Sequence, residues 1–290
     1  MPYRKSILAL QDLALRNVAE LFELNDLQYL PSILIDELYQ RRGELHFRVH
    51  NRELPAKIFI HTAAHQFDIS CICGKPIKFD IPNCQVIKRI TQICKKLTYL
   101  NLTGWDNVIP ADLTQLILSI PLITTLVLTT CNDSLLSSIG NYCPHLEHLD
   151  LTSCDNIGDN GIRFLCFDIN SQSRNSKIIS LNVTKTNVTQ HGCLMALKNL
   201  PNLKYFFHDF HKEILSLLGK LAASETFLSK CVEFSGKIHW SIEELKTATI
   251  FFPNLRKLFI TSANESSIPL MRFKRLEILN VYEFPNCNGK

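Results

Sequence analysis

The sequence lacks the short motifs that mark common catalytic sites. It has no glycine-rich loop of the kind that binds nucleotide phosphates, no Gly-x-Ser-x-Gly turn and no paired acid–base motif. No histidine or asparagine is tied to a cysteine by a recognisable motif, which argues against a cysteine nucleophile. We therefore expect a protein that is not an enzyme and that needs no cofactor.

Clusters of charge are also missing. Charged residues make up 20% of the chain, the net charge is +4, and the basic residues are scattered along the sequence. A nucleic-acid-binding domain normally gathers its basic residues on one face, so we expect no nucleic-acid partner. Apolar residues reach 46%, which is typical of a globular protein and excludes a largely disordered one.

We expect neither a secretory signal nor a membrane-spanning helix. Polar residues such as Asp12 and Arg16 interrupt any apolar signal core near the start of the sequence. The 20 residues from Leu113 to Asn132 carry no charge, but Pro121 and five threonines favour turns and a strand over a helix that crosses a bilayer. We expect a cytoplasmic or nuclear protein whose eleven cysteines are reduced, buried and structural.

A phrase of the form Leu-x-x-Leu-x-Leu recurs through the chain. Its four clearest copies begin at Leu97, Ile123, Leu146 and Ile178, at intervals of 26, 23 and 32 residues. Apart from the stretched interval, this spacing is typical of leucine-rich repeats, in which the leucines of each strand point into the core. The polar segment 171–177 explains the stretched interval as a loop insertion.

Weaker copies extend the array on both sides. Copies begin at Leu203, Leu255 and Leu276, and the 52 residues between the first two predict a degenerate repeat near 228–234. A degraded copy begins at Phe67 on the amino-terminal side.

Cysteines occupy fixed places in the repeats. Cys131 and Cys154 follow the last leucine of their phrases by three residues, where leucine-rich repeats commonly carry Asn or Cys. The segment 154–166 resembles the cysteine-containing subtype found in F-box and related ligase receptors. This resemblance implies that Ile-x-Asp-x-Gly-Ile starts the helix of the repeat and that Asp159 or a neighbour caps it.

The predicted fold is an α/β leucine-rich-repeat solenoid of the cysteine-containing type with an N-terminal helical box. We expect the helical module to span residues 1–43 and irregular N-terminal repeats to span 44–95. Regular repeats follow over 96–284, with a tail at 285–290.

The first predicted helix covers residues 7–24. Leu10, Leu13, Ala14 and Val18 recur along one side at helical spacing. The pattern resembles the BC box, the elongin-C-binding helix of ubiquitin-ligase substrate receptors, although Ala14 stands where that box usually has cysteine. The resemblance implies that these four residues pack into a groove of elongin C, which brings elongin B as a further partner.

The second predicted helix runs from about Pro31 to Arg42, and proline suits its first turn. Leu30, Pro31, Leu34 and Leu38 are similar to the cullin box of the cullin-2 class, which implies contact with cullin-2. The two boxes directly before leucine-rich repeats resemble the Zyg/Zer group of receptors, without the armadillo-type C-terminal domain of that group. The alternative is that both helices are a plain cap on the repeat core.

The outward side chains of the strands form the candidate binding surface for a target protein. Aromatic side chains often anchor interfaces, and the outward positions in the carboxyl-terminal half include Tyr205, Phe207, Phe259 and Tyr282. We expect the target to bind there.

One cluster suggests a metal. His61 and His65 precede Cys71, Cys73 and Cys84, and these residue types suit zinc. Structural zinc sites usually present Cys-x-x-Cys, whereas this sequence has Cys-x-Cys, so we expect no metal.

Two classes of function follow from these patterns. The first is a non-catalytic substrate receptor of a cullin-2/elongin BC ubiquitin ligase, with an F-box-type receptor as a variant. The second is a general leucine-rich-repeat interaction scaffold whose first helices form a cap.

Overall fold

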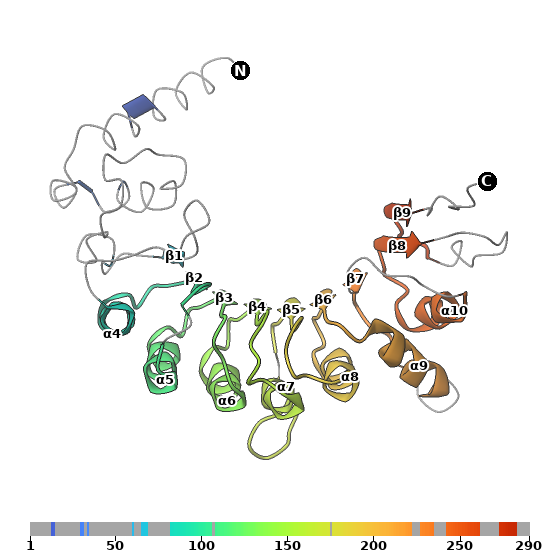
Figure 1. Ribbon diagram of the computed structural model, residues 1–290, viewed down its shortest axis with the longest axis horizontal. Helices are drawn as coiled ribbons and strands as arrows, with labels where there is room; N and C mark the ends of the chain where they lie inside the picture. The colour runs from blue at the N-terminus through green and yellow to red at the C-terminus, as the bar shows by residue number, and fades with distance from the viewer. Residues whose placement is uncertain are drawn as a thin grey trace, which may run out of the picture. The chain divides into compact units, whose positions relative to one another are not determined.

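The computed structural model of the chain describes residues 82–105, 108–174, 176–221, 227–234, 242–261 and 273–282, together with residues 13, 14, 30, 31, 34, 60 and 65–68. The chain divides into two compact units, residues 1–129 and 130–290. Within each unit, short strands alternate with helices along the chain (Figure 1). This alternation is the one that the repeated phrase predicts.

The first unit places its phrases in parallel strands. Its elements include β1 (Gln66–Asp68), α4 (Asn83–Ile93), β2 (Tyr99–Asn101), α5 (Pro110–Ser119) and β3 (Thr125–Val127). β2 pairs with both other strands, and Phe67, Leu100 and Leu126 share one register. All three side chains are fully buried, because alternate strand positions point to one face.

The prediction for the amino-terminal copy was wrong in register. Phe67 was expected to begin a phrase, but it pairs with Leu100, which is the second leucine of its own phrase. The copy therefore begins three residues earlier, at Ala64 in the sequence. An alanine at that position leaves no large apolar residue to mark the start of the repeat.

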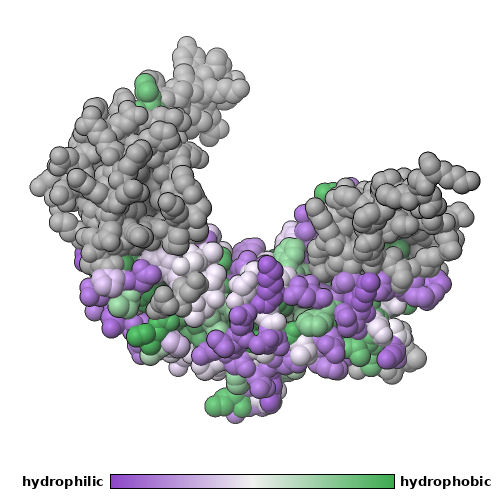
Figure 2. All heavy atoms as spheres, viewed as in Figure 1, coloured by the Kyte–Doolittle hydropathy of each residue, from purple (hydrophilic) through white to green (hydrophobic). Residues whose placement is uncertain are grey.

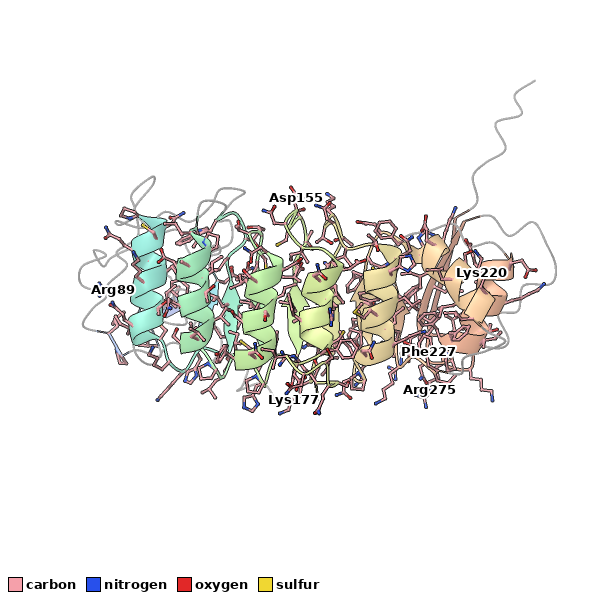
Figure 3. All side chains as sticks on the ribbon, turned by 90° about the horizontal axis from the view of Figure 1, so that it is seen from below. Arg89, Asp155, Lys177, Lys220, Phe227 and Arg275 are labelled. Atoms are coloured by element: carbon pink, nitrogen blue, oxygen red, sulfur yellow. The ribbon has the colours of Figure 1, made fainter. Side chains whose placement is uncertain are left out.

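The second unit continues the same alternation. Its elements are α6 (Asp133–Tyr142), β4 (His148–Asp150), α7 (Asp159–Cys166), β5 (Ser180–Asn182), α8 (Gln190–Asn199), β6 (Tyr205–Phe207), α9 (His211–Leu221), β7 (Glu233–Phe234), α10 (Ile242–Phe251), β8 (Lys257–Thr261) and β9 (Ile278–Tyr282). β4 to β7 form a parallel series, and β8 pairs in parallel with β9. The helices line one side of these strands (Figure 3).

The core of the second unit is a column of aligned apolar residues. Leu149, Leu181, Phe206 and Phe234 pair in register and are each at most 2% exposed. Phe234 confirms the degenerate repeat that was predicted near 228–234. The buried Cys231 takes the place of its first leucine.

The uncharged segment from Leu113 to Asn132 is not one long helix. It contains α5 from Leu113 onward, a turn, the strand β3 and the residues that lead to the N-cap of α6. None of the helices in the described ranges is both long and apolar enough to cross a membrane.

Helix starts in the second unit follow two patterns. Asn132 and Thr189 cap α6 and α8, and their side chains accept from Leu135 N and His191 N at 2.9 and 3.2 Å. The predicted cap of α7 was wrong, because its N-cap is Gly158 and no side chain caps it. Asp159 instead bonds to the next repeat.

Candidate protein-interaction surface

On the face of the second unit that the strands line, the first residue of each strand belongs to one continuous row. Pairing aligns four of them in β4 to β7, and Lys257 aligns with Ile278 in β8 and β9. The Arg256 N–H donates to the Val232 carbonyl at 2.9 Å and joins the two groups of strands. In order, the row is His148, Ser180, Tyr205, Glu233, Lys257 and Ile278.

Two of the predicted binding residues lie together on β6. Tyr205 is 37% exposed, and Phe207, two residues further on the same face, is half-buried. Phe259 lies in β8 and Tyr282 in β9, but their side chains are outside the described residues. The structure therefore brings Tyr205 and Phe207 to one face of β6.

An ion pair lies beside Tyr205. The Lys257 ammonium is 2.8 Å from the Glu233 carboxylate, and Glu233 is the strand partner of Tyr205. The hydrogen bond and the charge of Glu233 raise the pKa of Lys257, and Tyr205 acts in the same direction. The sequence did not reveal this pair, because Glu233 belongs to the degenerate repeat.

The threonines that follow β4 and β5 have a structural role. In the second unit the Asp150 carboxylate accepts from the Thr152 N–H at 2.9 Å, and the Asn182 amide oxygen accepts from the Thr184 N–H at 3.1 Å. Each hydroxyl also donates to the same side chain. These are Asx turns that end β4 and β5.

His208 takes the place of the last leucine in its phrase. It is 3% exposed, and its ring centroid lies 4.7 Å from that of Phe206 and 4.6 Å from that of Phe234. Its Nδ1 accepts from the Phe210 N–H at 3.1 Å. Burial, and to a smaller extent His211, lowers the pKa of His208 to about 3, so the ring is neutral and part of the core.

The repeat cysteines are buried thiols. Burial raises the pKa of Cys143, Cys154, Cys166 and Cys193 to about 12. The Cys131 thiol donates to the Asn132 carbonyl at 3.6 Å in the turn after β3. A thiol with such a pKa is a poor nucleophile at neutral pH, so these residues act in packing.

The predicted insertion between α7 and β5 begins with a loop that internal hydrogen bonds hold together. The Asp168 carboxylate accepts hydrogen bonds from the Asn170 and Gln172 N–H groups at 2.9 and 2.8 Å. Phe167 and Ser173 form an isolated antiparallel β-bridge. The loop extends beyond α7 in Figure 1.

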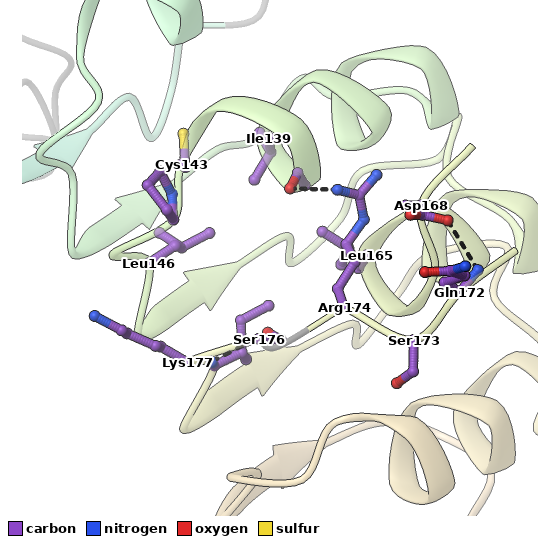
Figure 4. Close-up of a pocket in the computed structure, with 13 residues that line it drawn as sticks. Ile139, Cys143, Leu146, Leu165, Asp168, Gln172, Ser173, Arg174, Ser176 and Lys177 are labelled. Carbon is purple, nitrogen blue, oxygen red and sulfur yellow. Dashed lines mark hydrogen bonds between the residues drawn. The ribbon is translucent and has the colours of Figure 1, made fainter. Parts of the chain in front are cut away.

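Arg174 links this loop by hydrogen bonds to the carboxyl ends of α6 and α7. Its Nη1 donates to the Gly140 carbonyl at 2.8 Å, and its Nε donates to the carbonyls of Phe164 and Phe167 at 3.0 and 2.8 Å. A cation at helix carboxyl ends also interacts favourably with the helix dipoles. Arg174 and Lys177 are among the residues that line a cavity of about 330 Å³. Figure 4 shows both side chains.

The box residues are described only in part. Leu13 and Ala14 are helical and exposed, and Leu13 is 56% exposed. The Leu34 N–H donates to the Pro31 carbonyl at 2.9 Å, which fits a helical turn that begins at Pro31. Leu30 and Leu34 are half-buried. Leu10, Val18 and Leu38 lie outside the described residues.

The metal candidates are described only in part as well. His65 is exposed and Cys84 is half-buried, while His61, Cys71 and Cys73 lie outside the described residues. Within the ranges that the structure describes, no three His, Cys, Asp or Glu side chains gather as a metal site.

The coloured surface of the second unit in Figure 2 is largely hydrophilic, with separate hydrophobic patches. On that unit, the exposed apolar side chains include Tyr142, Phe164, Ile169, Leu228 and Ile250. Tyr205 and Ile278 differ from these because both lie in the strand row defined above.

Comparison with known sequences identifies one repeat. The family described as Leucine Rich repeat matches residues 142–166, which contain β4 and α7. No curated protein matches the chain significantly.

Solved structures give distant similarities. A chain of the crystal structure of the Rad7 and Elc1 complex in yeast is 15% identical, with a TM-score of 0.40 over 67% of this chain and 43% of that one. The leucine-rich repeat-containing protein LegL7 from Legionella pneumophila is 14% identical, with a TM-score of 0.38 over 81% and 89%. Leiomodin-1 actin-binding site 2 is 16% identical, with a TM-score of 0.33 over 56% and 83%. This chain thus spans less than half of the first of these.

The strand–helix alternation, the buried leucine columns and the match over residues 142–166 agree. The fold is an α/β leucine-rich-repeat fold, which in repeat proteins offers an extended surface for binding other proteins.

Proposed function

We propose that this chain is a non-catalytic substrate-recognition subunit of a cullin-2/elongin BC ubiquitin ligase. In this proposal the first helix binds elongin C, the second contacts cullin-2, and the strand-lined face of the second unit holds a target protein. The observation that carries the proposal is the order of the two box-like phrases, from Leu10 to Leu38, directly before the repeats.

The described box residues support this arrangement. Helix-in-groove recognition needs apolar side chains that are free on one side of a helix, and Leu13 is an exposed leucine in a helix. The hydrogen bond from the Leu34 N–H to the Pro31 carbonyl supports a helical turn at the start of the cullin-box phrase.

The target-binding part of the proposal rests on the strand row. Tyr205 has the exposed aromatic surface that often anchors an interface, and Phe207 adds a half-buried ring on the same strand. The neighbouring pair of Glu233 and Lys257 supplies polar contacts around them.

Co-purification with elongin B and C tests the ligase assignment. Wild-type chain is co-expressed with elongin B and C and compared with Leu10→Asp, which places a charge at the predicted groove. Leu122→Asp is the matched control, because Leu122 is an exposed leucine in the turn after α5. We expect elongin C with wild type and Leu122→Asp, and its loss with Leu10→Asp.

A wild-type eluate without elongin C would overturn the ligase assignment. Equal loss of elongin C in both variants would show that the effect is not specific to the box. A second series replaces Ala14 with cysteine, the usual residue of the BC box, and we expect elongin C binding to strengthen.

A further inference from the structure

The repeats of the second unit bring basic residues together that are scattered in the sequence. Each of the five successive repeats from β5 to β9 carries at least one of them within four residues before its strand. All are exposed. We call this set the basic edge: Lys177, Lys204, Lys230, Arg256, Lys274 and Arg275.

A backbone hydrogen-bond ladder shows that these positions are adjacent in space. The Lys204 N–H donates to the Ile179 carbonyl, and the Lys204 carbonyl accepts from the Val232 N–H, both at 2.8 Å. The ladder continues from Val232 to Arg256 and from Arg256 to Glu277, each at 2.9 Å. Because the strands are parallel, their starts all lie at one edge.

The positions of the labelled side chains in Figure 3 agree with this hydrogen-bond ladder. Lys177 and Arg275 are labelled along the same edge of the second unit in Figure 3, and Asp155 is labelled along the opposite edge. Asp155 follows β4, whereas both basic residues precede their strands.

The positive charge of the edge is largely uncompensated. Within the described ranges, Arg256 alone among the six has an acidic partner, at 3.4 Å from the Glu277 carboxylate. Lys177 lies 3.3 Å from the ring nitrogen of His145 instead of an acid. A row of unpaired cations attracts an anionic partner and steers its approach.

The dimensions fit an extended peptide. Neighbouring strands lie about 4.8 Å apart, so the five repeats cover roughly 19 Å. An extended chain advances about 3.3 Å per residue, and about six residues therefore span the edge. Tyr205 and Ile278, 37% and 41% exposed, lie in the adjacent strand row and offer apolar contacts.

We infer that the basic edge binds an acidic segment of a partner protein that also carries an apolar or aromatic side chain. The exposed side chains of Tyr205 and Ile278 in the adjacent strand row favour a protein segment over a nucleic acid. The number of cations points the same way, since DNA-binding proteins commonly neutralise six or more phosphates. The edge has six cations, of which Arg256 is already paired. Only the assignment of this segment to a ligase target rests on the proposed function.

Fluorescence anisotropy with the full chain tests the inference. The probe is a labelled peptide with a central phenylalanine between two runs of three glutamates, and the same peptide with glutamines is the neutral control. The edge variant combines Lys177→Glu, Lys204→Glu and Lys230→Glu. The matched control combines Lys212→Glu, Lys220→Glu and Lys246→Glu, which reverses three exposed lysines of α9 and α10.

We expect the edge variant to raise the Kd for the acidic peptide by about tenfold or more, because three attractive contacts become repulsive. The control variant should change the Kd by less than about twofold. The inference would be overturned if the edge variant and the control variant lost affinity for the acidic peptide equally. It would also be overturned if the wild-type chain did not bind that peptide. Circular dichroism of both variants shows whether they are folded, and a Lys→Gln set at the same edge positions gives a milder second test.

A single-stranded oligonucleotide with the same number of charges separates the partner classes. Tighter binding of the oligonucleotide, with the same dependence on the three lysines, would overturn the choice of an acidic protein. A chain that binds the peptide but does not co-purify with elongin C would retain this inference and lose the proposed ligase role.

Discussion

The Asp159 carboxylate accepts two hydrogen bonds from Thr189, one from its backbone N–H at 2.8 Å and one from its hydroxyl at 2.7 Å. Asp159 is the first residue of α7, and Thr189 is the N-cap of α8. Asp133, the first residue of α6, accepts from the N–H of Gly158 at 2.9 Å in the same way. These aspartates thus join the helix starts of adjacent repeats and place negative charge where helix dipoles favour it.

This relationship explains the glycine in the third position of α8. A Cβ added to Gly192 would lie 2.2 Å from Asp159 Oδ1 and 2.9 Å from a methyl of Val188. We expect Gly192→Ala to lower the free energy of unfolding by about 1–3 kcal/mol, because the carboxylate or the helix must shift. Urea denaturation measures the change.

Gly219→Ala is the control for this substitution. Gly219 lies in α9, and the nearest atom to an added Cβ is the Thr247 hydroxyl at 3.5 Å, an ordinary contact. Alanine is the better helix former, so we expect stability to rise by up to about 1 kcal/mol. If both substitutions destabilise equally, close approach of Asp159 is not the cause.

Arg174 supplies a second test. It donates hydrogen bonds to acceptors at the ends of both α6 and α7, and Arg174→Met leaves those acceptors without it. We expect a loss of about 2–3 kcal/mol in unfolding free energy, because hydrogen bonds from a charged donor are lost together. Arg163→Met is the control, since Arg163 makes one exposed contact of 3.4 Å with Ser171. A loss below about 0.5 kcal/mol is expected there, and equal losses would contradict the anchoring role.

The sequence was sufficient for the strands of the regular repeats but not for the register of β1, because alternate apolar positions determine which side chains a strand buries and the copy at β1 begins with an alanine. Leu149 and Leu181 were therefore placed correctly, and so was the degenerate repeat at Phe234. The contacts between repeats could not be predicted. The bonds of Asp159 to Thr189 and of Arg174 to Gly140 join residues about 30 positions apart, and one sequence shows no pattern that links them. The basic edge could not be predicted for the same reason, because its successive repeats place their basic residues 18 to 27 positions apart in the sequence, and these residues become neighbours only when the strands stack.

Cysteine reactivity tests the assignment of the thiols to the core. Seven of the cysteines in the described ranges are buried, and Cys84 is half-buried. We expect iodoacetamide at pH 7.5 to modify Cys84 in the native chain, and to modify the buried set only after urea is added. The buried set is Cys94, Cys131, Cys143, Cys154, Cys166, Cys193 and Cys231. Peptide mass spectrometry locates the label, and rapid native modification of Cys154 would contradict the buried placement.

The pH dependence of stability tests the buried imidazole of His208. Burial first, and then His211, lowers its pKa from 6.5 to about 3. The unfolded chain therefore binds a proton below pH 6.5 that the folded chain does not, and stability is lost as pH falls from 6.5 toward 3. When the pH is lowered from 7.5 to 5.5, this one group should lower the free energy of unfolding by about 1.4 kcal/mol.

His208→Leu restores the usual residue of the phrase and removes this titration. In urea denaturation at the two pH values, we expect the wild-type loss of stability to exceed the loss in the variant by about 1.4 kcal/mol. Burial also lowers the pKa of His211, so part of the wild-type slope remains in the variant. His191→Gln changes an exposed histidine and should keep the wild-type slope. If His208→Leu kept that slope as well, the ring would have to be protonated in the folded chain, which the close packing against Phe206 and Phe234 opposes.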